Sequence, residues 1–282
     1  DADTAMYQAK TAGRGRWVEY DPAMRDRAVR RLQIESDLHQ ALDEHQLRLV
    51  FQPVVRFDGG DLVGFEALLR WHHPRLGEIP PDEFVPIAEQ IGVIGVIGRW
   101  VLATACAQAA EWRTRFDRDL SMAVNVSARQ LDAPDLVDDV RTALDTTGLD
   151  PSSLVLEITE TALIGDAPGA VAVLDGLRRL GVRLAVDDFG TGYSSLSHLK
   201  QFPIDILKID RSFVGEIDAD TGVPDIVRGL LELARTLRLE TVAEGVESPS
   251  QLETLQALRP RPGLPVRPAA VGRRRRGAAR RR

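Results

Sequence analysis

The chain has 282 residues, 44% of them apolar, which is enough to bury one large core such as a single β/α barrel, or a small domain beside part of a barrel. The net charge is -6, but the last 24 residues hold ten arginines and no acidic residue, so the remainder has 26 basic against 42 acidic residues. A body this acidic gives no reason to expect nucleic-acid binding, and its carboxylates are compatible with sites that hold cations.

The cysteine content and the apolar segments indicate a cytoplasmic compartment. Cys106 is the only cysteine, which excludes a disulfide framework and a thiolate metal site. The most apolar window, 91–97, contains two glycines and soon meets Arg99, so it predicts a buried helix and not a bilayer span. Because the chain begins at Asp1 without a methionine, we expect a longer parent protein with upstream domains, membrane spans among them.

In chain order, the first predicted element is an exposed, charged connector helix over 22–44. From Gln46 onward, short β-branched runs alternate with amphipathic stretches, the pattern of repeated βα units. Seven strands are predicted, at 47–55, 63–70, 122–126, 154–159, 183–188, 206–209 and 241–244. Helices are predicted between them, at 83–112, 128–147, 169–180 and 223–237.

Polar or charged residues end almost every predicted strand. They are Glu66, Arg70, Asn125, Glu157, Asp187, Asp188, Lys208 and Glu244. The carboxyl ends of strands converge on one mouth in a closed barrel, whereas the outer strands of an open sheet lie too far apart to share a site. The fold class expected is therefore an α/β (β/α)8 barrel, one strand short.

The carboxylates at these strand ends form an oxygen-rich set suited to Mg²⁺ or Mn²⁺. The set comprises Glu66, Glu157, Asp187, Asp188 and Glu244, with Asn125. Six oxygen ligands exceed what one cation usually takes from protein, so two metals sharing Asp187 are expected, a pair that activates water and stabilises a leaving oxygen. Asp187 and Asp188 can share a site only if the chain bends there, which residues 189–192 would permit. Lys208 adds a positive charge, and Arg70 offers a planar fork for a phosphate.

Each of these residues also has a structural interpretation. A single carboxylate at a strand end is more often a helix cap, and Asp187-Asp188 could start a turn without metal. Lys208 could pair with Asp205 or Asp210, and Arg70 could form a surface ion pair. His72, His73 and His198 are interpreted as structural. The occurrence of six such residues at successive strand ends favours the metal site.

Seven motifs in order and spacing resemble those of the EAL-domain phosphodiesterases. They are Phe51-Gln52-Pro53, Glu66-Ala67-Leu68-Leu69-Arg70-Trp71, Asn125-Val126-Ser127, Glu157-Ile158-Thr159-Glu160, the stretch 187–196 beginning Asp187-Asp188-Phe189-Gly190, Lys208-Ile209-Asp210 and Glu244-Gly245-Val246-Glu247. The resemblance covers about residues 32–258. It implies a (β/α)8 barrel with an antiparallel first strand, and hydrolysis of cyclic di-GMP to the linear dinucleotide pGpG.

The same resemblance implies residue roles. Glu66, Asn125, Glu157 and Asp187 would hold one metal, Asp187 and Asp188 the second, and Glu244 would complete the acids. Lys208 would position the water, Arg70 and Gln52 would contact the substrate, and Glu160 would brace the loop from Phe189 to Ser195. In that family this loop couples dimerisation to metal binding, so a homodimer is expected.

Both ends of the chain differ from the barrel. Residues 1–20 contain Asp3-Thr4-Ala5-Met6-Tyr7 and resemble the final helix of a GGDEF diguanylate cyclase domain, which implies a tandem GGDEF-EAL parent with 21–45 as connector and 46–258 as the barrel. Residues 259–282 are rich in arginine and proline where the family has an eighth strand, and prolines cannot donate to a sheet ladder. We expect that strand to be lost and the tail to be disordered.

The genetic code offers an origin for this tail. Codons for residues 259–267 can be chosen so that the reading frame shifted by one base encodes Gly-Arg-Asp-Gln-Gly-Tyr-Leu-Phe. This resembles the glycine, short acidic turn and strand beginning Gln-Gly-Tyr that the family has there. A frameshift beside Leu258 is therefore our hypothesis, with poor stability and low activity as its consequence. The alternative to a frameshift is a basic tail that binds nucleic acid or acidic lipid. The alternatives to a phosphodiesterase are a catalytically inactive module that binds cyclic di-GMP and a different barrel metalloenzyme.

Overall fold

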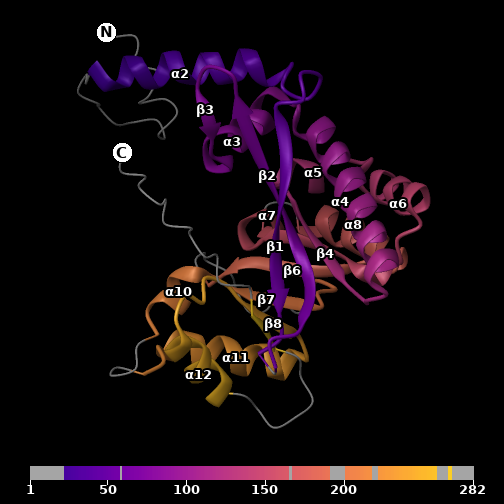
Figure 1. The fold of residues 1–282 in the computed structure, drawn as a ribbon, viewed down its shortest axis with the longest axis vertical. Helices are drawn as coiled ribbons and strands as arrows, with labels where there is room; N and C mark the ends of the chain where they lie inside the picture. The colour runs from indigo at the N-terminus through magenta and orange to yellow at the C-terminus, as the bar shows by residue number, and fades with distance from the viewer. Residues whose placement is uncertain are drawn as a thin grey trace, which may run out of the picture. The chain divides into compact units, whose positions relative to one another are not determined.

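The computed structural model describes residues 22–57, 59–164, 167–190, 201–217, 222–258 and 266–268. The chain divides into two compact units. One comprises the described parts of residues 1–48 and 69–97, and the other those of 49–68 and 98–282. Figure 1 shows the elements of both units along the chain. The predicted GGDEF remnant, residues 1–20, lies outside the described residues, as does the tail apart from 266–268.

The strands form one mixed sheet whose order of pairing is β1-β2-β4-β5-β6-β7-β8-β9, with β3 paired to β2. The strands are β1 Leu47–Val55, β2 Leu62–His73, β3 Gly77–Ile79, β4 Ser121–Val126, β5 Leu154–Thr159, β6 Arg183–Phe189, β7 Ile206–Ile209, β8 Glu240–Ala243 and β9 Val266–Pro268. From β2 through β4 to β9, successive neighbours on this path are parallel. All seven predicted strands are present, and the α/β barrel class is confirmed.

The first strand is antiparallel to the second, as expected. Backbone hydrogen bonds join the two strands near both ends, from the Arg56 amide to the Asp61 carbonyl and from the His72 amide to the Gln46 carbonyl. Between the two pairs, the residue number falls along β1 while it rises by nearly the same amount along β2. The two strands therefore run in opposite directions, as in an antiparallel hairpin. The loop between β1 and β2 is short, so no crossover helix is needed.

Helices follow the parallel strands. They are α2 Pro22–Leu38, α3 Pro81–Ile91, α4 Ile94–Phe116, α5 Ala128–Leu131, α6 Leu136–Thr147, α7 Glu160–Ile164, α8 Ala167–Arg179, α10 Arg211–Gly215, α11 Asp225–Leu237 and α12 Pro249–Ala257, with a 3-10 turn at Pro151–Ser153. The single helix predicted over 128–147 is two, α5 and α6, separated by residues 132–135. The helix predicted over 83–112 is interrupted at Gly92, whose left-handed φ of 80° ends α3. No helix in the described part of the chain combines the length and apolar character that crossing a bilayer requires.

In the described residues the eighth strand of the barrel is β9, three residues long and parallel to β8, where the sequence predicted the strand to be lost. Pro268 stands opposite Ala243 at the end of this ladder. A proline is tolerated there because β9 lies at the end of the pairing order, where one edge of the strand needs no donor. No pairing between β9 and β1 is seen among the residues that the structure describes, so the described sheet does not close.

Strand alternation places an apolar layer beneath the predicted site. Ala123, Val155, Ala185, Ile206 and Val242 come from five neighbouring parallel strands and form one buried cluster. Successive side chains on a strand point to opposite faces, so the residue two positions later returns to the same face. Each member of the apolar cluster is therefore followed, two residues nearer the carboxyl end, by a residue of the predicted site.

The unit formed by residues 22–48 and 69–97 is held by polar contacts of α2. The predicted connector helix ends at Leu38, earlier than expected, and it packs against α3 by burying Ile34 and Leu38. Arg30 forms an ion pair with Glu83 on α3. The buried His73 places Nε2 at 2.8 Å from Asp37 Oδ2, while its Nδ1 accepts from two backbone amides after β2. The helix is therefore part of this unit.

Replacing Asp37 by asparagine tests this attachment. Hydrogen bonds from Gln33, His73 and Arg75 lower the pKa of the Asp37 carboxyl. Stability from a lowered carboxyl pKa is present above the unfolded-state value and is lost as pH falls through the folded-state value. We expect Asp37→Asn to lower the free energy of unfolding at neutral pH by about 1–2 kcal/mol in urea titrations, and the difference to shrink below about pH 4.

The exposed Asp26 of the same helix supplies the control, since Asp26→Asn should change stability little. An effect of Asp37→Asn that stayed constant from neutral pH to about pH 2 would contradict the assignment.

Candidate functional site

Five polar residues form a layer directly above the apolar cluster, at the carboxyl ends of neighbouring strands. They are Asn125 on β4, Glu157 on β5, Asp187 on β6, Lys208 on β7 and Glu244 just after β8. Glu66 on β2 joins them, because its Oε1 accepts from Asn125 Nδ2 at 3.0 Å. The sequence predicted that these strand ends meet, and the structure brings all six residues together.

Lys208 lies at the centre of this layer. Its side chain is 2% exposed, and Nζ lies 2.6 Å from Glu157 Oε2, 2.6 Å from Glu244 Oε1 and 3.0 Å from Asp187 Oδ2. Glu66 Oε1 is farther away, at 3.8 Å. The contacts come from four different strands, so one ammonium links β2, β5, β6 and the end of β8. The pairing of Lys208 with Asp205 or Asp210 that was considered from the sequence is not what the structure has. Asp205 accepts instead from the Leu184 amide.

The charges of this layer shift one another's ionisation. Burial raises the pKa of Glu157 well above its usual range, and the charges of Glu66 and Asp187 act in the same direction against the ammonium of Lys208. Burial likewise raises the pKa of Glu244 to about 7. Burial opposes the charged form of Lys208, but the surrounding carboxylates outweigh it and raise the pKa of Lys208. With four carboxylates around one ammonium, the cluster carries an excess of negative charge when fully ionised.

A bend in β6 allows Asp187 and Asp188 to lie in one site. Asp188 has a left-handed φ of 53°, and the pairing of β6 with β7 shifts register between Val186 and Phe189. The Asp188 amide donates to Asp187 Oδ1 at 3.0 Å. The expected bend is therefore present, but it lies at Asp188 itself and begins before the glycine-rich loop, whose residues 191–200 lie outside the described part of the chain.

Sequence reasoning did not assign Asp210 to the site. Asp210 caps α10, accepting from the Ser212 amide at 2.9 Å. Its carboxyl interacts with that of Asp188, whose pKa is raised by burial and by the charges of Asp187 and Asp210. Asp210 stands two residues after Lys208 in the motif Lys208-Ile209-Asp210 and just before a short helix. Residues two apart on a strand share a face, so the position of Asp210 two residues after Lys208 was the sequence signal that could have assigned it to the site.

Two further contacts fix the loops at the carboxyl end. Glu160, 3% exposed, accepts with Oε2 from the Gly190 amide at 2.7 Å, a contact at the start of the loop 189–195 that it was predicted to brace, whose residues 191–195 lie outside the described part of the chain. The Glu244 amide donates to the Ile209 carbonyl and extends the ladder of β7 and β8 by one residue. Gly245 follows with a φ of 68°, and a Cβ there would lie 2.7 Å from Arg211 Cβ. Only glycine allows the chain after Glu244 to pass so close to α10.

The predicted substrate residues are placed as follows. Gln52 lies on β1, partly buried, in the same unit as the carboxylate layer. Arg70 belongs to the other unit, where its guanidinium donates to the Leu69 carbonyl at 2.8 Å. His72 and His73 are structural, as predicted, with His72 Nδ1 at 3.0 Å from Glu78. His198 lies outside the described residues.

The chemistry of the layer fits divalent cations. Among the described residues, no group of three or more His, Cys, Asp or Glu side chains is arranged around a common point free to hold a metal ion. The reason is visible in the contacts, since the carboxylates converge on the Lys208 ammonium. Burial first, and the neighbouring carboxylates second, raise the pKa of Glu157 and Glu244, and a hard cation with oxygen ligands would favour their ionised forms.

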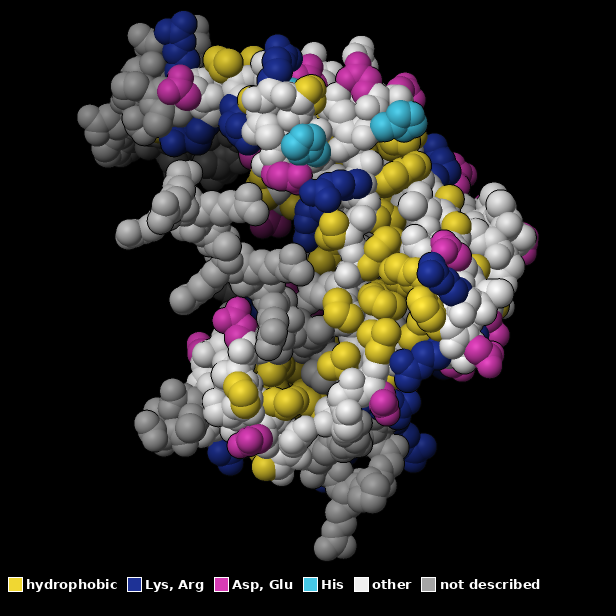
Figure 2. All heavy atoms as spheres, viewed as in Figure 1, with side chains coloured by type: hydrophobic (Ala, Val, Ile, Leu, Met, Phe, Trp, Pro, Cys, Tyr) yellow, Lys and Arg dark blue, Asp and Glu magenta, His cyan; other side chains and the backbone are white. Residues whose placement is uncertain are grey.

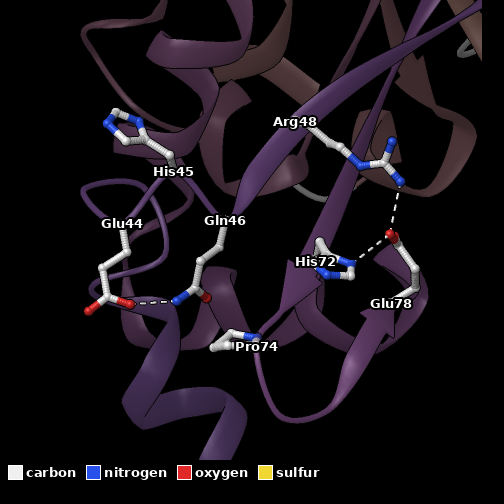
Figure 3. A pocket seen from close by; sticks show the side chains of 7 residues that line it. All are labelled: Glu44, His45, Gln46, Arg48, His72, Pro74 and Glu78. Atoms are coloured by element: carbon white, nitrogen blue, oxygen red, sulfur yellow. Dashed lines mark hydrogen bonds and ion pairs between the residues drawn. The ribbon is translucent and has the colours of Figure 1, made fainter.

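Two other pockets offer fewer groups that could take part in a reaction. Figure 3 shows one of about 810 Å³ in the unit that holds α2, lined by Glu44, His45, Gln46, Arg48, His72, Pro74 and Glu78. Arg48 and His72 both bind Glu78, and Gln46 donates to Glu44, so several of its polar groups are paired with each other.

An apolar groove lies in the other unit, lined by Leu62, Phe65, Trp112, Phe116, Arg118 and Leu120. Trp112 packs against Phe51 and Phe65 there. The space-filling view in Figure 2 shows hydrophobic side chains gathered on the face that carries β1 and β2. Arg118 is the one charged residue among those lining the groove, and no carboxylate, histidine or other proton acceptor for hydrolysis is among them.

Comparisons with known proteins agree with this geometry. The model of the EAL domain family matches residues 35–261. A bifunctional diguanylate cyclase/cyclic di-GMP phosphodiesterase, MucR of Pseudomonas aeruginosa, is 46% identical over 92% of this chain and 38% of its own length. The cyclic di-GMP phosphodiesterase NbdA of the same organism is 41% identical over 91% of this chain and 33% of its own length.

A solved structure, the PaMucR phosphodiesterase in complex with cyclic di-GMP, superposes with a TM-score of 0.77 at 45% identity. The match covers 84% of this chain and 94% of that one. The chain belongs to the EAL domain family. It spans about a third of the length of the two curated relatives.

Removing the Glu160 carboxylate tests the attachment of the loop after β6. In Glu160→Ala the Gly190 amide loses its acceptor, so we expect its hydrogen-exchange protection, measured by NMR, to fall about tenfold. Glu160→Gln retains an acceptor oxygen and should keep most of the protection. Equal protection in wild type and Glu160→Ala would show that this hydrogen bond does not hold the loop.

Proposed function

We propose that this chain hydrolyses cyclic di-GMP to pGpG with Mg²⁺ or Mn²⁺ as cofactor. The observation that carries the proposal is the layer of four carboxylates, Asn125 and Lys208 at the carboxyl ends of adjacent strands. The family and the cyclic di-GMP complex of a 45% identical structure support the choice of substrate. Excess carboxylate at the mouth of a β/α barrel is suited to phosphodiester hydrolysis with bound cations.

The proposed metal ligands are divided between two ions. Glu66, Asn125, Glu157 and Asp187 would hold one, and Asp187 with Asp188 the other, with Glu244 completing the set. Bound there, the ions would supply Lewis acidity and lower the pKa of water. Asp210 would support Asp188, because the two carboxyls interact and Asp210 is fixed by Ser212.

The protein's own groups have the remaining roles. Water adds to one phosphorus while the bond to the 3′ oxygen breaks, which leaves the phosphate on the 5′ end, as the product pGpG requires. Lys208 would hold the attacking water or the negative charge that develops on the phosphoryl oxygens. Gln52 and Arg70 would contact the substrate, Arg70 through bidentate hydrogen bonds to a phosphate. Glu160 would keep the loop after β6 in place.

The proposed setting of the domain is a longer signalling protein. Residues 1–20 would be the end of a GGDEF domain, 21–45 a connector, 46–258 the phosphodiesterase, and 259–282 a frameshifted tail. Upstream GGDEF and sensory domains are the proposed partners within the parent, and a homodimer is the proposed assembly. Nucleic acid is not a proposed ligand, and a cytoplasmic location of the domain is part of the same proposal.

Hydrolysis is tested with the purified chain, Mn²⁺ and cyclic di-GMP, following pGpG by chromatography. Neutralising one buried carboxylate in Glu157→Gln should lower kcat/KM at least about 100-fold, because it removes both a proposed ligand and a partner of Lys208. The control is Asp145→Asn, an exposed acid on α6, which should leave the rate unchanged. A rate for Glu157→Gln close to wild type would contradict the proposed site.

The reduced eighth strand favours a second candidate, a module that binds cyclic di-GMP without hydrolysing it. A chain whose reading frame is restored after Leu258 would complete the barrel, and we expect its turnover with Mn²⁺ to exceed that of the present chain. Equal turnover would contradict an effect of the tail. Binding of cyclic di-GMP in the presence of Ca²⁺, without turnover in Mn²⁺, would support the second candidate.

A further inference from the structure

Lys208 makes more contacts with acids than the positioning of a single water requires. Three carboxylate oxygens lie within 3.0 Å of Nζ and a fourth at 3.8 Å, and the side chain is almost fully buried. An ammonium has three protons, so the three short contacts use its full donor capacity. A buried charge of this kind is stable only when it is paired, and here the pairing comes from four strand ends.

We propose that the Lys208 ammonium is a built-in cation that holds the carboxylate layer together until a divalent ion binds, and that the divalent ion displaces it. The inference rests on the proposed function, because it concerns the same carboxylates. It adds that metal binding at this site is an exchange of one cation for another.

The carboxylates that Nζ contacts are among the proposed metal ligands. Glu157 Oε2, Asp187 Oδ2 and Glu244 Oε1 are each taken by the ammonium, and Asp187 Oδ1 already accepts from the Asp188 amide. Glu66 Oε1 accepts from Asn125 as well as facing Nζ. A divalent ion that took Glu157 Oε2, Asp187 Oδ2 or Glu244 Oε1 as a ligand would therefore compete with Nζ for it.

The Lys208 ammonium can move away from the acids without a change in the backbone of the sheet. The β7 backbone around Lys208 is paired with β6 on one side and β8 on the other, so its main chain is fixed. The four methylenes between Cα and Nζ allow the charge to move by rotation about side-chain bonds. An ammonium displaced from the acids remains at the mouth of the barrel, where a positive charge can meet a phosphate.

Thermal unfolding of the full chain tests the exchange. Lys208→Met keeps an unbranched side chain one atom shorter and removes the charge, so in chelator its Tm should fall on the order of 10 °C below wild type. Adding Mg²⁺ or Ca²⁺ should raise the Tm of Lys208→Met more than that of wild type and close most of the gap, because no ammonium competes. Arg118→Met, which removes an exposed cation from the same unit, should match wild type in both conditions.

The outcomes separate the two proposals. Equal rises in Tm for wild type and Lys208→Met would overturn the displacement while leaving a metal site in place. A fall in chelator with no response of either protein to either metal would overturn both the displacement and the metal-dependent function. An unchanged Tm of Lys208→Met in chelator would overturn the role of the ammonium as the built-in cation.

A measurement on the wild-type chain covers the case in which Lys208→Met does not fold. The sequence has three lysines, Lys10, Lys200 and Lys208, so NMR of protein labelled with ¹⁵N at lysine gives few ammonium signals. In chelator, one signal should be protected from exchange with water by the three short contacts. Addition of Mg²⁺ should shift this signal and remove the protection. A signal unaffected by saturating Mg²⁺ would overturn the proposal.

Discussion

The burial of one ammonium among four carboxylates is the interaction on which the rest of the site depends. Isolated, each of these groups would be costly to bury, and the acids would repel one another. Together they form a network in which Lys208 ties β2, β5, β6 and the end of β8 to a common point. Burial is the main cause of the raised pKa of Glu157 and Glu244, and the neighbouring carboxylates raise it further against the Lys208 ammonium. This electrostatic environment is the physical basis of the proposed cation site.

Regular strand geometry places most of these charged side chains. The two-residue period of the strands puts the acids one step above an apolar cluster whose members are Ala123, Val155, Ala185, Ile206 and Val242. Two exceptions to regular strand geometry complete the layer. Asp188 takes a left-handed conformation so that it can lie beside Asp187, and Gly245 lets the chain turn away from Glu244 against α10. The apolar cluster keeps water from one side of the network, which strengthens its electrostatic interactions.

Much of this could be predicted from the sequence, because the strand ends carry their own signal. Polar residues end successive apolar runs, and their convergence follows from the topology of parallel strands. What the pattern could not show was the pairing within the layer. Lys208 had its sequence neighbours Asp205 and Asp210 as plausible partners. Its short contacts are instead with Glu157, Asp187 and Glu244, which come from other strands and reach Lys208 only through the fold.

Boundaries and local conformation were harder to predict than the identity of the site residues. The long helical pattern over 83–112 hid the break at Gly92, because the apolar period continues across it. The role of Asp210 was hidden by its second function as a helix cap. The short β9 shows that three residues of a proline-rich segment can still pair with β8 when the strand lies at the end of the pairing order.

The most direct test of the account is calorimetric titration of Mn²⁺ into the full chain at neutral pH. The account predicts saturable binding that is weakened at least about tenfold when Glu157, the most deeply buried acid of the layer, is replaced by glutamine. Absence of binding to the wild-type chain, or equal affinity in Glu157→Gln, would contradict the claim that this carboxylate layer is a cation site.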